Sequence, residues 1–349
     1  MGFAGVAAGA FGTRGAGAQD RPKPAETVDA SYKARSTVAL IHGEDRRKNV
    51  YSALKAIEEQ IAPKIRQKEY VLVKPNCVTS RPLSGTHADA LRGVMDFLEP
   101  YQKPVVIAES SAAQTPEAFE EFRYANLLSE YKSLKPKLID LNQEGRYFTS
   151  HALDRDMYPL PVRLAKRFID PDAFILGVSI TKTHNGLVAT MSVKNMTMGA
   201  PIHSAPGAAA RWSDKVKFHE GVRQTNYGML LTAEKIAPYW GAAVIDGYEG
   251  MEGLGPVSGT AIRSNIAMAS TDFVAADRVG LEAMGINPDW VGYLQFCHKA
   301  GIGQYDLNKI DLAGGVEIAS IRKKYKLAPN IEEQLKWMGP MTEPPQILR

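Results

Sequence analysis

The chain has 349 residues and a formal net charge of +4, and it is 44% hydrophobic and 23% charged. This is ordinary globular composition, with enough chain for one large domain or two smaller ones, and the short basic clusters are too sparse to predict a nucleic-acid-binding surface. The two cysteines, Cys77 and Cys297, are too few for a disulfide framework or for an iron–sulfur cluster held by this chain alone.

The first residues are predicted to be a targeting segment. Residues 3–11 are small and apolar, but they are fewer than the roughly 20 that cross a bilayer. Residues 16–18, Ala-Gly-Ala, have the form of a signal-peptidase site, although no basic region precedes the apolar stretch. We therefore expect a signal-peptide remnant over 1–18, of the twin-arginine type, and a polar linker over 19–36. This predicts an exported, periplasmic protein without a transmembrane segment in the mature chain; the alternative is a low-complexity start and a cytoplasmic protein.

Apolar runs typical of buried strands alternate with helical patterns along the rest of the chain. Continuous Val/Ile/Leu strands separated by helices indicate a mostly parallel sheet covered on both faces. We predict a three-layer α/β domain over 37–316, with an irregular insertion near 197–220 and a C-terminal helix and tail over 317–349. Strands are expected over 36–43, 70–76, 104–110, 137–142, 172–181, 189–195, 241–247, 264–270 and 309–315, and the later helices over 221–237, 272–284, 288–300 and 329–338.

Polar side chains follow several predicted strands. In open α/β sheets ligands bind beyond the carboxyl ends of the strands, so these side chains are expected to surround one cavity. Lys194 is the most unusual, because it is predicted to end an apolar strand, where a ligand anion or a protein carboxylate must face its ammonium. His184, in a predicted turn, and His219, at the start of a helical stretch, are candidates for proton transfer, although a lone histidine is more often structural. The strand-end candidates for ligand binding are Lys74, Asn76, Lys182 and Asn195.

The stretch 246–259, DGYEGMEGLGPVSG, is predicted to be a glycine-rich loop after a buried strand. Its acids could coordinate a hard cation through oxygen, and its glycines would let backbone N–H groups approach a ligand. The simpler interpretation is a solvated turn with exposed acids. Asp277 lies more than one turn inside a helix whose expected N-cap is Asp272, so an inward carboxylate there needs a partner. The candidate metal ligands are Asp246, Glu249, Glu252 and Asp277, and the candidate backbone positions are Gly253 and Gly255.

Taken in order, these motifs resemble the domain of unknown function called DUF362. The resemblance covers about residues 36–315, while the Rossmann, P-loop, zincin and nucleophile-elbow motifs are missing. The resemblance implies that eight positions are functional, namely Asn76, His184, Lys194, Asn195, His219, Asp246, Glu252 and Asp277. Some members are fused to iron–sulfur modules, but this chain lacks the cysteine run, so that cofactor is not expected; many members look exported by the twin-arginine route. The matching motifs are KPN (74–76), KTHNGLVATMSVKNMTMG (182–199), FHEG (218–221), DGYEGMEGLGP (246–256), ASTDFVAAD (269–277) and GIGQYD (301–306).

Two functions remain open at this point. The first is an enzyme that acts on a small anionic molecule by metal-assisted or Lys/His acid–base catalysis. In that case Lys194 and Lys182 would hold the anion, His184 or His219 would transfer protons, and the acids would bind a divalent metal or orient the base. The second is a non-catalytic ligand-binding or assembly protein of the cell envelope, with an envelope or redox protein as partner. An enzyme should concentrate these groups within hydrogen-bonding reach, whereas a binding protein could spread them over a surface.

Overall fold

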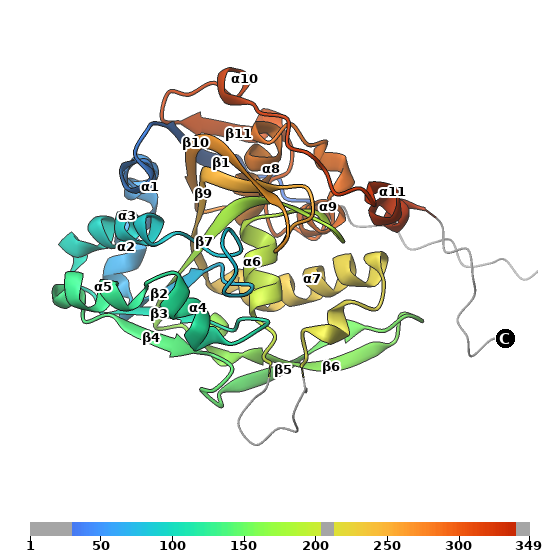
Figure 1. The fold of residues 1–349 in the computed structure, drawn as a ribbon, viewed down its shortest axis with the longest axis horizontal. Coiled ribbons are helices and arrows are strands. Elements are labelled where there is room, and N and C mark those ends of the chain that lie inside the picture. The colour runs from blue at the N-terminus through green and yellow to red at the C-terminus, as the bar shows by residue number, and fades with distance from the viewer. Residues whose placement is uncertain (1–29, 204–212, 340–349) are drawn as a thin grey trace, which may run out of the picture. The chain divides into compact units, whose positions relative to one another are not determined.

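A mixed nine-stranded sheet forms the centre of the computed structural model, which describes residues 30–203 and 213–339. Its order is β11-β1-β10-β9-β7-β2-β3-β4, and β8 pairs with β7 (Figure 1). Five of the pairings in these residues are parallel and three are antiparallel, which confirms a mostly parallel sheet. The strands are β1 Ser36–His42, β2 Tyr70–Pro75, β3 Val105–Glu109, β4 Lys137–Asp140, β7 Ala173–His184, β8 Val188–Thr190, β9 Trp240–Glu252, β10 Thr260–Ser270 and β11 Ile310–Ala313.

Helices cover both faces of the sheet, as predicted (Figure 1). Successive residues of each strand point to opposite faces, so Val71 and Val73 belong to one buried cluster and Leu72 to the other. One face packs against α1 Arg46–Ala56, α2 Glu58–Gln67, α3 Ala88–Leu98, α4 Thr115–Glu121 and α5 Ala125–Glu130. The other packs against α6 Ser192–Gly199, α7 Val222–Ile236, α8 Phe273–Ala283, α9 Gly292–Lys299 and α10 Ile318–Ile321, with α11 Ile331–Gln334 beyond them.

A hairpin that the sequence did not predict lies beside the main sheet. Strands β5 Tyr147–Leu153 and β6 Pro159–Ala165 pair antiparallel with each other, Leu164 of β6 also forms a bridge with Pro201, and α7 packs against β5. The predicted insertion near 197–220 is described only in part, because 204–212 fall outside the described residues, as do the signal remnant, most of the linker and the end of the tail. No helix in 30–203 or 213–339 is both long enough and apolar enough to cross a membrane.

Lys194 does not end a strand, so that prediction is wrong. Strand β8 stops at Thr190, and α6 begins at Ser192. The helix starts there because the carboxylate of Asp277, from α8, accepts hydrogen bonds from the N–H groups of Ser192 (2.7 Å) and Val193 (3.0 Å). Those are among the first N–H groups of the helix, which have no partner within it. Lys194 therefore projects from the first turn of a capped helix.

The predicted loop at 246–252 is instead the second half of a long strand. β9 continues to Glu252 and pairs antiparallel with β10. Its glycines allow close packing, since a Cβ on Gly250 would lie 2.3 Å from Thr181 Oγ1 and one on Gly247 would lie 2.6 Å from Ile266 Cγ1. In the buried half of this strand, glycine is required because neighbouring side chains occupy the space of a larger residue.

Candidate functional site

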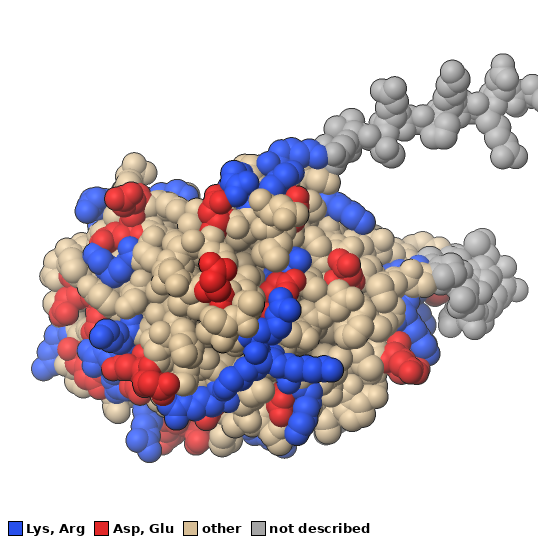
Figure 2. Space-filling model, turned by 90° about the horizontal axis from the view of Figure 1, so that it is seen from above, with Lys and Arg blue, Asp and Glu red and all other residues tan. Residues whose placement is uncertain are grey.

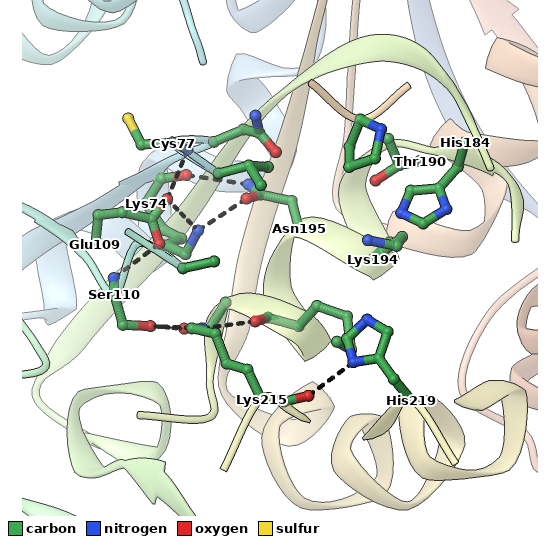
Figure 3. A pocket seen from close by; sticks show the side chains of 16 residues that line it. Lys74, Cys77, Glu109, Ser110, His184, Thr190, Lys194, Asn195, Lys215 and His219 are labelled. Carbon is green, nitrogen blue, oxygen red and sulfur yellow. Dashed lines mark hydrogen bonds and ion pairs between the residues drawn. The ribbon is translucent and has the colours of Figure 1, made fainter. Parts of the chain in front are cut away.

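A cavity of about 130 Å³ lies at the carboxyl ends of β2, β3 and β7, where α6 approaches the sheet (Figure 3). The structure brings together there six residues that the sequence predicted: Lys74, Asn76, His184, Lys194, Asn195 and His219. Lys74, Asn76 and His184 lie at or just after strand ends, as expected, whereas Lys194 and Asn195 come from α6 and His219 from the segment before α7. Sequence reasoning missed several other lining residues, namely Cys77, Glu109, Ser110, Thr190, Met198, Lys215 and Pro256.

One wall of the cavity is a buried ion pair between Lys74 and Glu109. The Lys74 ammonium donates to Glu109 Oε2, to Asn195 Oδ1 and to the Pro75 carbonyl oxygen, each at 2.8 Å. All three donors of the ammonium are thus used within the protein. Glu109 also accepts the N–H groups of Cys77 and Ser110, both at 2.8 Å, so its charge is held at this wall. Lys74, expected to bind ligand, is a structural support.

Lys194 has a different environment. Its side chain is 8% exposed, and within the described residues no acceptor or carboxylate bonds to its ammonium. Burial and the charge of Lys74 lower its pKa to about 8. In Figure 3 the side chain of Lys194 lies at the cavity wall, between Asn195 and the ring of His184. A buried ammonium without a protein partner is costly.

Two further lysines add positive charge. Lys215 lines the cavity, where it donates to Ser110 Oγ (3.1 Å) and to the Met198 carbonyl oxygen (2.8 Å), and burial lowers its pKa to about 7. Lys182, predicted to contact the ligand, lies behind the lining and donates to the Ser84 carbonyl oxygen (3.2 Å). Burial, and then the charge of Lys194, lower the pKa of Lys182 to about 7. Lys182 therefore adds positive electrostatic potential to the cavity but does not line it.

The two histidines present different atoms to the cavity. His184 accepts the Gly186 N–H at Nδ1 (2.9 Å), which places the proton of its neutral ring on Nε2. Nδ1 of His219 lies 2.9 Å from the Lys215 carbonyl oxygen, which can only accept, so Nδ1 carries the proton and Nε2 is an acceptor. Burial, followed by the charge of Lys194, lowers the pKa of both rings. One neutral ring is therefore a donor and the other a base.

Two of the predicted metal ligands, Asp246 and Glu249, lie away from the cavity. Asp246 is buried beside the first residue of α1, with its Oδ2 3.3 Å from Nε of Arg46. Burial raises the pKa of Asp246 to about 6. A carboxylate oxygen of Glu249 is 3.9 Å from the same guanidinium. Both acids therefore face an arginine, although Asp246 is buried and the side chain of Glu249 is 40% exposed.

The other two predicted ligands, Glu252 and Asp277, also have protein partners. Glu252 accepts the Lys326 N–H (2.9 Å), and Asp277 caps α6 as described above. Burial raises the pKa of Asp277 to about 7. Nowhere in the described parts of the chain do three or more His, Cys, Asp or Glu side chains converge as a metal site would require. The four candidates therefore do not form one metal centre.

Gly253 and Gly255 are used within the protein rather than offered to a ligand. Their N–H groups donate to the carbonyl oxygens of Lys326 (2.8 Å) and Gly253 (2.9 Å), respectively. A Cβ on Gly255 would lie 1.9 Å from the Thr183 carbonyl oxygen, so no larger residue fits against the end of β7. The close approach of this segment brings Pro256 to the cavity wall.

Cys77 is a packing residue. Its thiol is buried and lies 3.4 Å from the Tyr124 hydroxyl. Burial, and then the carboxylate of Glu109, raise its pKa to about 12, so the reactive thiolate is not formed near neutral pH.

The fold and the cavity define a three-layer α/β protein with a buried, lysine-rich cavity. The chain belongs to the DUF362 family, because the profile of "Domain of unknown function (DUF362)" matches residues 71–282. This confirms the resemblance drawn from the motifs. A thylakoid-associated protein of Synechocystis sp. is 26% identical over 244 residues, which are 68% of this chain and 70% of that protein.

A solved structure from Thermotoga maritima aligns with a TM-score of 0.38 and 10% sequence identity. The alignment covers 75% of this chain and 59% of that one.

Proposed function

We propose that the cavity binds a small anionic molecule and that His184 and His219 exchange protons with it. The observation that carries the proposal is the charge balance. Lys74, Lys194 and Lys215 line the cavity, and the one lining carboxylate, Glu109, is already bound to Lys74. In the described residues Lys194 has no carboxylate partner, and Lys215 bonds to uncharged oxygens, so a bound carboxylate or phosphate would add the missing negative charge.

The size of the cavity limits the ligand. Its volume of about 130 Å³ is below the roughly 300–1,000 Å³ of pockets that hold drug-sized ligands. The positive charge of the site lies inside the protein, on buried lysines.

On the face drawn in Figure 2, basic and acidic side chains are interspersed and much of the surface is uncharged. A small acid that enters the protein fits these features better than a macromolecular polyanion bound across the surface.

The binding test compares two cavity lysines with a lysine at the other edge of the sheet. Lys64 is exposed in the last turn of α2, just before β2 begins, whereas the cavity lies where β2 ends. Sulfate and lactate should raise the melting temperature of the wild type and of Lys64→Met. The shift should disappear in Lys194→Met and weaken in Lys215→Met, because each loses a cation that faces the anion. Equal shifts in all four proteins would contradict anion binding in the cavity.

The proton-transfer role has its own test. Nitrogen NMR of labelled histidines should find both rings neutral at pH 7.5, because their pKa values lie below the ordinary value, with the proton on Nε2 of His184 and on Nδ1 of His219. If the rings are charged at that pH while anions still bind, the cavity is a binding site only. That outcome would favour the non-catalytic alternative.

Export remains a separate proposal. It rests on the Ala-Gly-Ala at residues 16–18, after the apolar stretch 3–11. Amino-terminal sequencing of native protein should find a chain that begins near Gln19, whereas an intact Met1 would contradict export.

A further inference from the structure

We propose that Lys194 forms an imine with the carbonyl carbon of a small oxo acid bound in the cavity. The inference rests on the anion binding proposed above and adds the chemical class of the ligand. It follows from the contacts of the lysines, considered one at a time, and from the complementary atoms that the two histidines present.

Lys194 is the one lysine of the cavity lining whose nitrogen makes no bond to the described protein. Lys74 donates all three of its N–H groups, and Lys215 donates two. The three bonds of Lys74 require the protonated amine, whereas the two bonds of Lys215 occupy both donors that its neutral amine would have. Lys194 can lose a proton without breaking any contact in the described residues, which is the condition for a nucleophilic amine.

The surroundings of Lys194 favour the neutral amine. The oxygens of Glu109, the lining carboxylate, are taken by Lys74 and by the N–H groups of Cys77 and Ser110. With a pKa of about 8, about a tenth of Lys194 is unprotonated at pH 7, compared with well under a thousandth of an ordinary lysine. Desolvation beside other cations is a recognised way to activate lysine for imine formation.

The two histidines supply the proton transfers that the reaction needs. The Lys194 nitrogen attacks the carbonyl carbon, and the Nε2–H of His184 stabilises the negative oxygen by a hydrogen bond. His219 takes a proton from the new ammonium at Nε2 and returns it to that oxygen, which gives a neutral carbinolamine. A second nitrogen proton follows the same route, the C–O bond breaks, and the products are the imine and water. The sum is one carbonyl compound and one amine giving one imine and one water, without oxidant or reductant.

The acid group of the ligand also has a partner. Lys215 keeps one of its three N–H donors after its bonds to Ser110 and Met198, and it lines the same cavity. A short oxo acid could place its carboxylate at Lys215 and its carbonyl carbon at Lys194. The volume of about 130 Å³ suits compounds of two to four carbons, such as glyoxylate and pyruvate.

The experiment is reductive trapping. The full chain is incubated with glyoxylate or pyruvate and sodium cyanoborohydride, and the adducts are located by peptide mass mapping. We expect Lys194 to be labelled roughly ten-fold faster than the average surface lysine, since its amine is partly neutral at pH 7. Lactate, which has the carboxylate but no carbonyl, should compete with the labelling. The matched variant is Lys194→Arg, which keeps the charge but cannot form the imine.

The outcomes separate the two proposals. Labelling at Lys194 that lactate suppresses supports both. Lactate that stabilises the protein while Lys194 remains unlabelled overturns the imine and leaves anion binding in place. If lactate gives no stabilisation and the labels fall on surface lysines alone, both proposals fail. The mapping on the wild type decides the matter even if Lys194→Arg does not fold.

Discussion

Replacement of Lys194 by methionine should make the protein more stable at neutral pH. The pKa of Lys194 is about 8 in the folded protein, against an ordinary 10.5, and at 1.36 kcal/mol per pH unit the difference corresponds to about 3 kcal/mol. Because the folded-state value is the lower one, the unfolded chain binds more protons between pH 8 and 10.5. The free energy of unfolding therefore rises with pH through that range, and the full cost of the charged lysine applies below it.

Urea unfolding of wild type and Lys194→Met at pH 7 and again near pH 10 measures this cost. The variant should gain about 2–3 kcal/mol at pH 7, and most of that gain should vanish near pH 10, where the lysine is neutral in the folded protein. A variant that loses about 3–5 kcal/mol at pH 7 would show that a carboxylate faces Lys194, because loss of one member of a buried ion pair leaves the other unpaired. That result would refute the anion site and the imine together.

Three further changes test the supports of the cavity. Glu109→Gln removes the charge that holds Lys74 and should cost about 3–5 kcal/mol by urea unfolding; wild-type stability would contradict the pairing. Asp277→Ala leaves the first N–H groups of α6 without acceptors and should cost about 2 kcal/mol, and Asp277→Asn should cost clearly less because it keeps an acceptor. Gly250→Ala places a Cβ 2.3 Å from Thr181 Oγ1 and should lower the melting temperature in calorimetry, whereas an unchanged value would show that the strands can separate locally.

The layers of the fold could be predicted because the buried strands are continuous apolar runs. Residues 70–73 and 104–108 can be strands of a covered sheet, and the structure places them side by side. The β5–β6 hairpin was missed because prolines at positions 159 and 161 weaken the strand pattern of β6. It is stabilised by contacts with α7, which follows much later in the chain.

The site was predictable where it depends on strand ends and not where it depends on tertiary contacts. Asn76 and His184 could be predicted because ligands of open sheets bind beyond the carboxyl ends of the strands. Glu109 could have been predicted in the same way, since it ends β3. The start of α6 could not be predicted from the sequence. The apolar run before Lys194 is typical of a strand, and the residue that caps the helix, Asp277, belongs to another helix. Lys215 has no signal in the sequence that separates it from a solvated lysine.

The acids of the stretch 246–259 show what local composition cannot predict. Asp246 and Glu249 alternate with glycines, which favoured a flexible cation-binding loop. The structure instead pairs that segment with β10 and places Arg46 against the carboxylates. Arg46 begins a helix far away in the sequence, so neither the partner nor the regular strand could be inferred from the local pattern.

The pKa of Lys194 itself can be measured by NMR of selectively labelled lysine side chains, with and without sulfate. We expect Lys194 to titrate near pH 8 in the free protein. A bound anion should then raise that pKa, because a negative neighbour favours the charged amine. Titration near 10.5, the ordinary value, with no response to sulfate would contradict a buried, unpaired lysine that awaits an anion.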